Sequence, residues 1–216
     1  RDSMSDAFYR VVRFFGSHPF WMSSRCVVTG VEHIPRSGPA IIACTHSSPF
    51  DVPLLIRHSP RLLDFVSIVE VFENPFVAWF YGSMNAFPLD RHKPDAPTVR
   101  TIFSRLEQGR AVALFPEGAI RRGERSVIHT RTIKPGVGRI ANRAGAPVVP
   151  AVVINSVAYS RGVAWLPTRR TRYAVAFGPP IAPTQDAADI ERSLVAELVR
   201  LYESAAAALP ESCRVI

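Results

Sequence analysis

Residues 39–51 read Pro39-Ala40-Ile41-Ile42-Ala43-Cys44-Thr45-His46-Ser47-Ser48-Pro49-Phe50-Asp51. The apolar residues at the start of this stretch predict a short buried strand, and the polar residues after it predict a turn. A turn of four residues allows the Asp51 carboxylate to fold back onto one ring nitrogen of His46, which leaves the other nitrogen to take a proton from a hydroxyl. The H-x4-D pattern is loose, so for this stretch alone a surface histidine near a helix-capping aspartate is the simpler interpretation.

Further strands and helices follow on both sides of this stretch. Short apolar and β-branched runs predict strands at residues 26–31, 40–44, 62–69, 110–115, 147–154 and 173–177. Apolar residues recur at helical spacing over 99–106 and 190–201, and a further helix is expected to start near Gly136. Strands that alternate with helices indicate an α/β fold, so we expect a single domain with a mixed, mostly buried sheet flanked by helices.

The N-terminal residues are predicted to form an amphipathic helix that precedes the main domain. Residues 6–16 place apolar side chains at helical spacing with arginines on the flanks: Phe8, Val11, Val12 and Phe15, beside Arg10 and Arg13. We therefore divide the chain into an amphipathic helical segment, residues 1–24, and a main domain, residues 25–216. A helix in the membrane interface and a helix packed on the protein's own core are equally compatible with this pattern.

Composition restricts the class of protein and its partners. The 216 residues are 47% hydrophobic and 20% charged, which suits a folded domain with a sizeable core. A net charge of +8 indicates an anionic partner. No zinc-finger, helix-turn-helix or aromatic–basic pattern is present, so a membrane lipid surface is favoured and nucleic acid is not expected.

Cysteine usage and hydropathy indicate where the protein works. Three scattered cysteines without a C-x-x-C pair predict no disulfide framework and no metal site. No apolar run reaches the roughly 18 residues of a spanning helix, and no cleavable signal pattern opens the chain. We expect a cytoplasmic protein that is peripheral on the inner face of the cell membrane.

Three more blocks follow the H-x4-D block in a set order. They are Phe87-Pro88-Leu89-Asp90-Arg91, Phe115-Pro116-Glu117-Gly118 and Ala146-Pro147-Val148-Val149-Pro150. Together the four blocks resemble the 1-acylglycerol-3-phosphate acyltransferase family of H-x4-D glycerolipid acyltransferases, and the resemblance spans about residues 25–178. It implies a glycerolipid-acyltransferase-like fold. It also implies transfer of a fatty acyl group from acyl-CoA or acyl-carrier protein, as cosubstrate and with no other cofactor, to a hydroxyl of a lysophospholipid. The family's default acceptor is 1-acyl-sn-glycerol 3-phosphate, which gives phosphatidic acid.

The resemblance also assigns roles to residues. His46 and Asp51 are the expected catalytic pair, with the acceptor's own hydroxyl in the place of an enzyme serine. Substrate-binding residues are expected at Arg91, Phe115, Pro116, Glu117, Gly118, Arg121, Arg122 and Lys134, with Glu117 and Gly118 on the acceptor's polar head and Arg91 on its phosphate.

Two departures from the family pattern keep the acceptor open. Ile68 stands where the family usually has a lysine, and Ala119-Ile120 stand where it typically has Thr-Arg. Arg121, Arg122 or Lys134 could replace these cations, or the acceptor could be another polar lipid. A non-catalytic basic membrane-binding module is the alternative from a different class.

Overall fold

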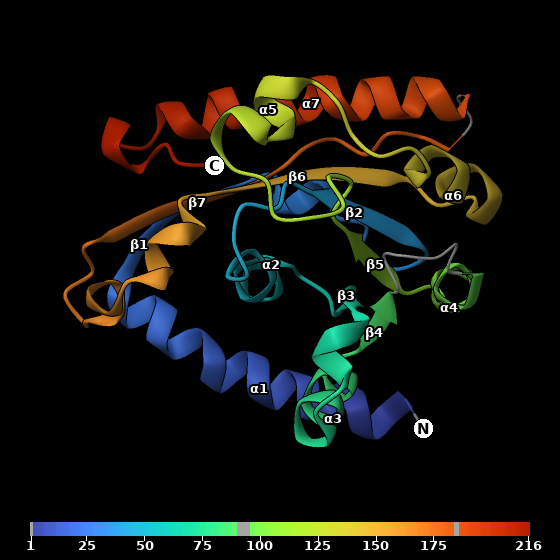
Figure 1. The fold of residues 1–216 in the computed structure, drawn as a ribbon, viewed down its shortest axis with the longest axis horizontal. Coiled ribbons are helices and arrows are strands. Elements are labelled where there is room, and N and C mark those ends of the chain that lie inside the picture. The colour runs from blue at the N-terminus through green and yellow to red at the C-terminus, as the bar shows by residue number, and fades with distance from the viewer. Residues whose placement is uncertain (1, 90–95, 184–185) are drawn as a thin grey trace.

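A seven-stranded sheet forms the centre of the structure, a computed structural model that describes residues 2–89, 96–183 and 186–216 (Figure 1). The strands are β1 (Ser24–Thr29), β2 (Ala40–Cys44), β3 (Leu63–Ile68), β4 (Ala86–Leu89), β5 (Ala111–Leu114), β6 (Val148–Ile154) and β7 (Thr171–Phe177). Their order is β1-β7-β6-β2-β5-β3-β4, and every neighbouring pair is parallel except β6 with β7, which is antiparallel. The expectation of a mixed sheet in an α/β domain is confirmed.

Helices cover both faces of this sheet. They are α1 (Asp2–Ser23), α2 (Asp51–His58), α3 (Pro75–Ser83), α4 (Ala96–Glu107), α5 (Val127–Thr130), α6 (Val137–Ala144) and α7 (Ala187–Ala207). In Figure 1, α5 and α7 lie along one face, and α1 and α2 lie on the opposite side. The helices that the periodicity predicted over 99–106 and 190–201, and after Gly136, are confirmed as α4, α7 and α6.

One strand was not predicted from the sequence. β4 overlaps the start of the Phe87–Arg91 block and has only four residues, including Pro88, which lacks a backbone N–H. Because β4 is the edge strand and pairs only with β3, one side of its backbone needs no partner strand, and an edge tolerates a proline. A strand of four residues that contains a proline lacks the apolar or alternating pattern that predicts a strand.

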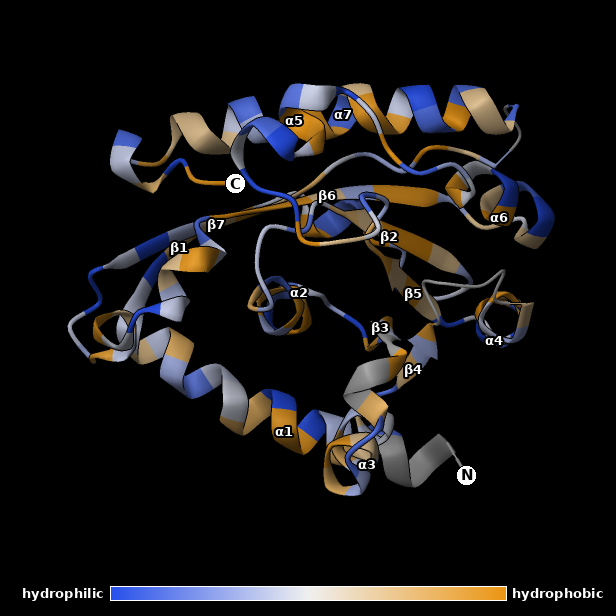
Figure 2. Ribbon diagram, in the orientation of Figure 1, coloured by the Kyte–Doolittle hydropathy of each residue, from blue (hydrophilic) through white to orange (hydrophobic). Residues whose placement is uncertain are grey.

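The central strands are buried on both faces. Alternate residues of β2 enter two separate core clusters: Ile41 and Ala43 pack on the side of α4, α6 and α7, whereas Ala40, Ile42 and Cys44 pack on the side of α2. Figure 2 shows that the strands at the centre of the sheet are hydrophobic along their length. A sheet that is covered by helices on both faces needs apolar side chains at every position of its central strands. This explains the continuous apolar run at 40–44.

Parallel pairing determines which loops meet. β2 lies between β5 and β6 and is parallel to both, so the carboxyl ends of these three strands share one edge of the sheet. The loops that leave this edge carry His46 after β2, Phe115 after β5 and Ser156 after β6. Open α/β sheets bind ligands at such an edge.

The N-terminal helix has two apolar faces rather than one. Tyr9 and Phe20 are buried against the domain, whereas Val11 and Phe15 are more than half exposed. Packing on the protein's own core thus applies to one side of α1, and a position in the membrane interface stays a prediction for the exposed side. Within residues 2–89, 96–183 and 186–216, none of the helices combines the length and apolar character that crossing a bilayer demands. The division of the chain after residue 24 stays a prediction.

Candidate functional site

His46 and Asp51 form a hydrogen-bonded pair at the end of β2. His46 Nδ1 lies 3.0 Å from Asp51 Oδ2. The same carboxylate oxygen accepts hydrogen bonds from the backbone N–H groups of Ser47, at 2.8 Å, and Ser48, at 2.9 Å. Asp51 is fully buried as the first residue of α2, while the side chain of His46 keeps 13% of its surface exposed. The contact predicted from the spacing is present, and it holds the imidazole in one orientation at the surface of a cavity.

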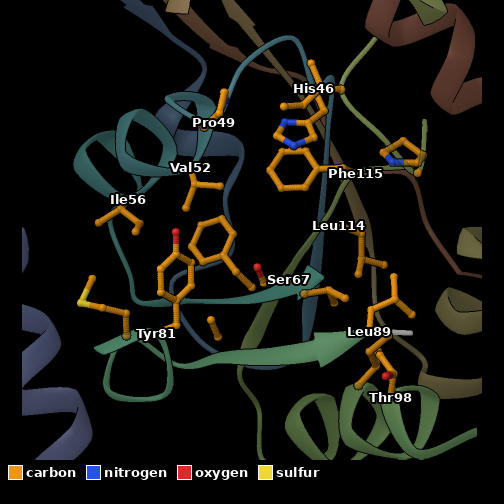
Figure 3. Close-up of a pocket in the computed structure, with 18 of the residues that line it drawn as sticks. His46, Pro49, Val52, Ile56, Ser67, Tyr81, Leu89, Thr98, Leu114 and Phe115 are labelled. Carbon is orange, nitrogen blue, oxygen red and sulfur yellow. The ribbon is translucent and has the colours of Figure 1, made fainter. Parts of the chain in front are cut away.

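Phe115 fixes the plane of the His46 ring. Figure 3 shows the two rings next to each other. They stack with their centroids 4.0 Å apart and their planes 22° from parallel. Phe115 follows directly on β5, so the parallel neighbour of β2 supplies it. With one edge held by Asp51 and one face covered by Phe115, the imidazole has little freedom to turn.

Glu117 braces the backbone of this site. Its Oε2 accepts a hydrogen bond from the backbone N–H of His46 at 2.6 Å, and its Oε1 accepts one from the N–H of Val127 at 2.7 Å. Only 6% of Glu117 is exposed, and burial raises the pKa of its carboxyl. Both oxygens are thus engaged inside the protein, and the geometry does not support the expected contact of Glu117 with the acceptor's polar head.

The three candidate cations after the Phe115–Gly118 block differ in what they contact. Arg121 donates its backbone N–H to the His46 carbonyl at 2.7 Å, and the Arg122 guanidinium donates through Nε to the Ser47 carbonyl. Both therefore help to shape the His46 turn. Lys134 instead borders the cavity, together with Pro116 and Gly118.

The absence of a side chain at Gly118 allows the Lys134 side chain to pack against the turn at residues 116–118. The φ of Gly118 is +68°, and a Cβ there would lie 2.6–2.8 Å from the last three atoms of the Lys134 side chain. Lys134 also donates its backbone N–H to the Pro116 carbonyl at 2.8 Å. A glycine at this position allows the left-handed turn and leaves room for the lysine.

Two residues of the sequence analysis cannot be placed. Arg91 lies outside the described residues, and so does the side chain of Ile68 at the end of β3. Ile120 is 41% exposed and lines the cavity, so an apolar side chain occupies the position where the family typically has an arginine. The phosphate-binding role of Arg91 stays a prediction.

A cavity of about 960 Å³ extends from His46 into the domain. Figure 3 shows His46 and Phe115 at one end and a largely hydrophobic wall around the rest. The wall is supplied by α1, α2, α3, α4 and α6 and by β3, β4 and β5, and it includes Val12, Val52, Ile56, Met84, Val99 and Ile102. The sequence analysis missed these residues, because apolar side chains that line a cavity have the same helical spacing as those that fill a core.

Ser156 is a further residue of the site that was not predicted. Its hydroxyl lies 2.5 Å from Asp51 Oδ1 and 3.3 Å from the Ser47 hydroxyl. A single serine after a strand matches no sequence motif, so its role could not be predicted. Only the pairing of β6 with β2 brings it to Asp51.

No group of three or more His, Cys, Asp or Glu side chains is arranged to hold a metal ion within the part of the chain that the structure describes. Cys26, Cys44 and Cys213 are all free thiols.

Known proteins resemble this chain in sequence and fold. A family model described as Acyltransferase matches residues 25–154. A 1-acyl-sn-glycerol-3-phosphate acyltransferase of Bacillus subtilis is 33% identical over 126 residues, which are 56% of this chain and 58% of that protein. The protein of the same name from Streptococcus pneumoniae is 25% identical over 154 residues, 70% of this chain and 52% of that protein. The chain thus spans a little over half the length of these relatives.

The fold has a solved counterpart. The crystal structure of the 1-acyl-sn-glycerophosphate (LPA) acyltransferase PlsC from Thermotoga maritima superposes with a TM-score of 0.68 at 21% identity. The superposition covers 94% of this chain and 81% of that one. At this identity the likeness concerns the fold.

Proposed function

Because the chain belongs to the acyltransferase family, we propose that it moves a fatty acyl group from a thioester donor, acyl-CoA or acyl-carrier protein, to a free hydroxyl of a lysophospholipid. The observation that carries this proposal is the His46–Asp51 pair, 3.0 Å apart, at one end of a large apolar cavity. The pair supplies a base, and the cavity has the size of pockets that hold a small-molecule ligand, about 300–1,000 Å³.

The reaction needs one base and no covalent enzyme intermediate. His46 takes the proton of the acceptor hydroxyl on Nε2 while the hydroxyl oxygen attacks the thioester carbonyl. The C–S bond of the tetrahedral intermediate then breaks, and the thiolate leaves with the proton that His46 returns. Asp51 stays ionised and stabilises the imidazolium that forms between the two steps.

The acyl chain has a place beside this pair. The cavity wall is largely apolar: Leu114 and Ile56 lie on opposite sides of the space in Figure 3, and Met84 also lines it. Removal of a long alkyl chain from water stabilises its bound state by roughly 0.8 kcal/mol for each buried CH₂ group. The cavity therefore suits a fatty acyl group better than a short polar one.

Lys134 is the described cation best placed for an acceptor phosphate. It borders the same cavity as His46, and its side chain lies over Gly118, two residues before Ile120. An ammonium group can hold a phosphate as a point charge. This placement supports 1-acyl-sn-glycerol 3-phosphate as the acceptor, with Lys134 in the role of the cation that is absent at Ile120.

The outer side of α1 and α3 suits a lipid surface. On α1, Phe14, Phe15 and Trp21 are 62%, 66% and 56% exposed, and on α3, Phe76 and Trp79 are 72% and 56% exposed. The two helices touch through Phe8 and Trp79, whose ring centroids lie 5.3 Å apart, and α1 and α3 lie together on one side of Figure 2.

These two helices also link the lipid surface to the cavity. Val12 and Gly16 of α1 and Phe80 and Tyr81 of α3 line it. Exposed aromatic side chains and nearby arginines, such as Arg169 over the Trp21 ring, are typical of a protein that lies on anionic lipid. We therefore place the protein on the membrane surface, with the acyl chain entering from the bilayer side.

The decisive experiment is product analysis by mass spectrometry. The purified chain is incubated with palmitoyl-CoA, or palmitoyl-acyl-carrier protein, and a panel of lysolipids with and without a terminal phosphate. We expect acylation of the phosphate-bearing lysolipid. His46→Ala should reduce the rate by about 10²–10⁴-fold, the contribution of general-base catalysis, with the fold intact by circular dichroism. Wild-type protein that acylates nothing in the panel, or His46→Ala within threefold of it, would refute the proposal.

A further inference from the structure

A serine just after the end of β6 places its hydroxyl group against the Asp51 carboxylate. Ser156 begins the short helix η4 (Ser156–Ser160) and is fully buried. Its Oγ donates to Asp51 Oδ1 at 2.5 Å, and the Ser47 hydroxyl lies at a longer 3.5 Å from the same oxygen. Asp51 Oδ2 has other partners: His46 Nδ1 and two backbone N–H groups. Ser156 is thus the near donor to Oδ1 within the described residues.

The turn before Ser156 is held by two segments that are distant in sequence. Asn155 has φ +63° and ψ 21°, a left-handed conformation that asparagine tolerates better than most residues. Its side-chain amide donates to the Arg172 carbonyl of β7 at 2.7 Å, and its backbone N–H donates to the Val215 carbonyl at 2.7 Å. Because β7 and the C-terminal residues both hold Asn155, the position of the following serine is well determined.

We propose that Ser156 is a positioning residue for the transfer reaction proposed above: its hydroxyl fixes the plane of the Asp51 carboxylate, and through it the His46 imidazole. Ser156 lies beyond residues 25–154, which match the family model, and it does not line the cavity. Its effect must therefore pass through Asp51 rather than through contact with a substrate.

Loss of the hydroxyl has two consequences. The carboxylate can turn about its terminal bond, so the imidazole is less often aligned with the acceptor hydroxyl, and misplacement by about 1 Å can cost roughly 10²-fold in rate. The charge on Asp51 also loses a donor, which makes the carboxylate a stronger base for a proton or for the imidazolium. Through this second effect the neutral imidazole forms only at higher pH, so the acidic limb of the pH–rate profile moves to higher pH.

Ser156→Ala replaces none of the titratable groups near Asp51. They are His46 itself, Cys44 on β2 and Glu117 after β5, each of which interacts electrostatically with its neighbours across the site. A shift seen in a Ser156 variant therefore reports the Asp51–His46 pair.

Three variants separate positioning from simple destabilisation. Ser156→Ala removes the hydroxyl, and Ser156→Thr keeps it. Ser59→Ala is the matched control, because Ser59 is also fully buried and donates a hydrogen bond, at 2.8 Å to the Arg61 carbonyl, but makes no contact with Asp51 among the described residues. Each variant is measured for kcat and KM on the acceptor, for the pH profile of kcat, and for the titration of the His46 ring by NMR without substrate.

We expect kcat of Ser156→Ala to fall about 10- to 100-fold with KM within about twofold, by analogy with other small displacements of catalytic groups. The His46 titration should move to higher pH, and Ser156→Thr should restore most of both properties. Ser59→Ala should change neither. A kcat of Ser156→Ala within threefold of wild type, or a His46 titration that does not move, would overturn the proposal.

The NMR arm also separates this inference from the proposed function. It needs no substrate, so it tests the link from Ser156 through Asp51 to His46 whatever the acceptor is. If the wild type transferred no acyl group while the titration still moved as expected, the proposed function would be wrong and the link would stand.

Discussion

Replacing Glu117 with glutamine tests the part of the site where the geometry and the resemblance disagree. The carboxylate accepts hydrogen bonds from the N–H groups of His46 and Val127, at 2.6 and 2.7 Å, and is 6% exposed. In Glu117→Gln one oxygen becomes an NH₂ group, which cannot accept from a backbone N–H. One charge-assisted hydrogen bond is therefore lost, and a buried donor is left facing another donor.

The size of the effect follows from these contacts. A hydrogen bond to a charged group contributes about 1.5–3 kcal/mol, so the free energy of unfolding should fall by roughly 2 kcal/mol. For a chain of 216 residues this corresponds to a loss of about 4–8 °C in Tm. Because one of the two bonds holds the His46 backbone, we expect kcat to fall about 10-fold or more while the acceptor KM changes little.

Thermal unfolding and steady-state kinetics at several acceptor concentrations check this prediction. Glu191→Ala is the control, because it removes Oε1, which accepts from the N–H groups of Gly136 and Gly138, at 2.7 and 3.2 Å, near the start of α6 and away from the His46 backbone. It should lower Tm without a comparable loss of kcat. A Glu117→Gln variant with unchanged Tm and kcat but a several-fold higher acceptor KM would refute the bracing role and favour direct contact with the acceptor.

Three other perturbations have definite expected outcomes. Changing Phe14 and Phe15 together to serine should weaken sedimentation with anionic vesicles by about 30-fold, from roughly 2 kcal/mol of lost apolar burial; equal binding would show that α1 does not face lipid. Lys134→Ala should raise KM about tenfold for a phosphate-bearing acceptor but not for one without a phosphate, and an equal change for both would exclude a phosphate contact. Burial, with Arg57 and Arg13 nearby, lowers the pKa of His58 to about 4 from 6.5. The unfolded chain therefore binds a proton that the folded chain does not, and the free energy of unfolding should fall as pH drops from 6.5 to 4. Urea denaturation of His58→Gln should show a smaller fall over this range, and an identical fall would contradict the assignment.

The sequence was sufficient where a feature depends on neighbouring residues. The buried strand at 40–44, the helices α4 and α7, and the approach of Asp51 to His46 all follow from local periodicity or from a turn of four residues. The four motif blocks also led to the acyltransferase family, which the family match confirmed. These features persist whatever the distant parts of the chain do, so a pattern search can find them.

The tertiary structure decided the rest, because it depends on which strands lie side by side. The parallel pairing of β2 with β5 and β6 brings Phe115 and Glu117 to His46, and Ser156 to Asp51, across 69 to 105 positions of sequence. It showed that Glu117 holds the backbone at His46 and Val127, while its contact with a substrate stays a prediction, and it placed Lys134 rather than Arg122 beside the cavity. The sequence determined the candidate catalytic groups, the His46 imidazole and the Asp51 carboxylate, and the short turn that joins them. Only the pairing of distant strands determined the partners of these groups, and only the packing of helices against the sheet determined the cavity that they face.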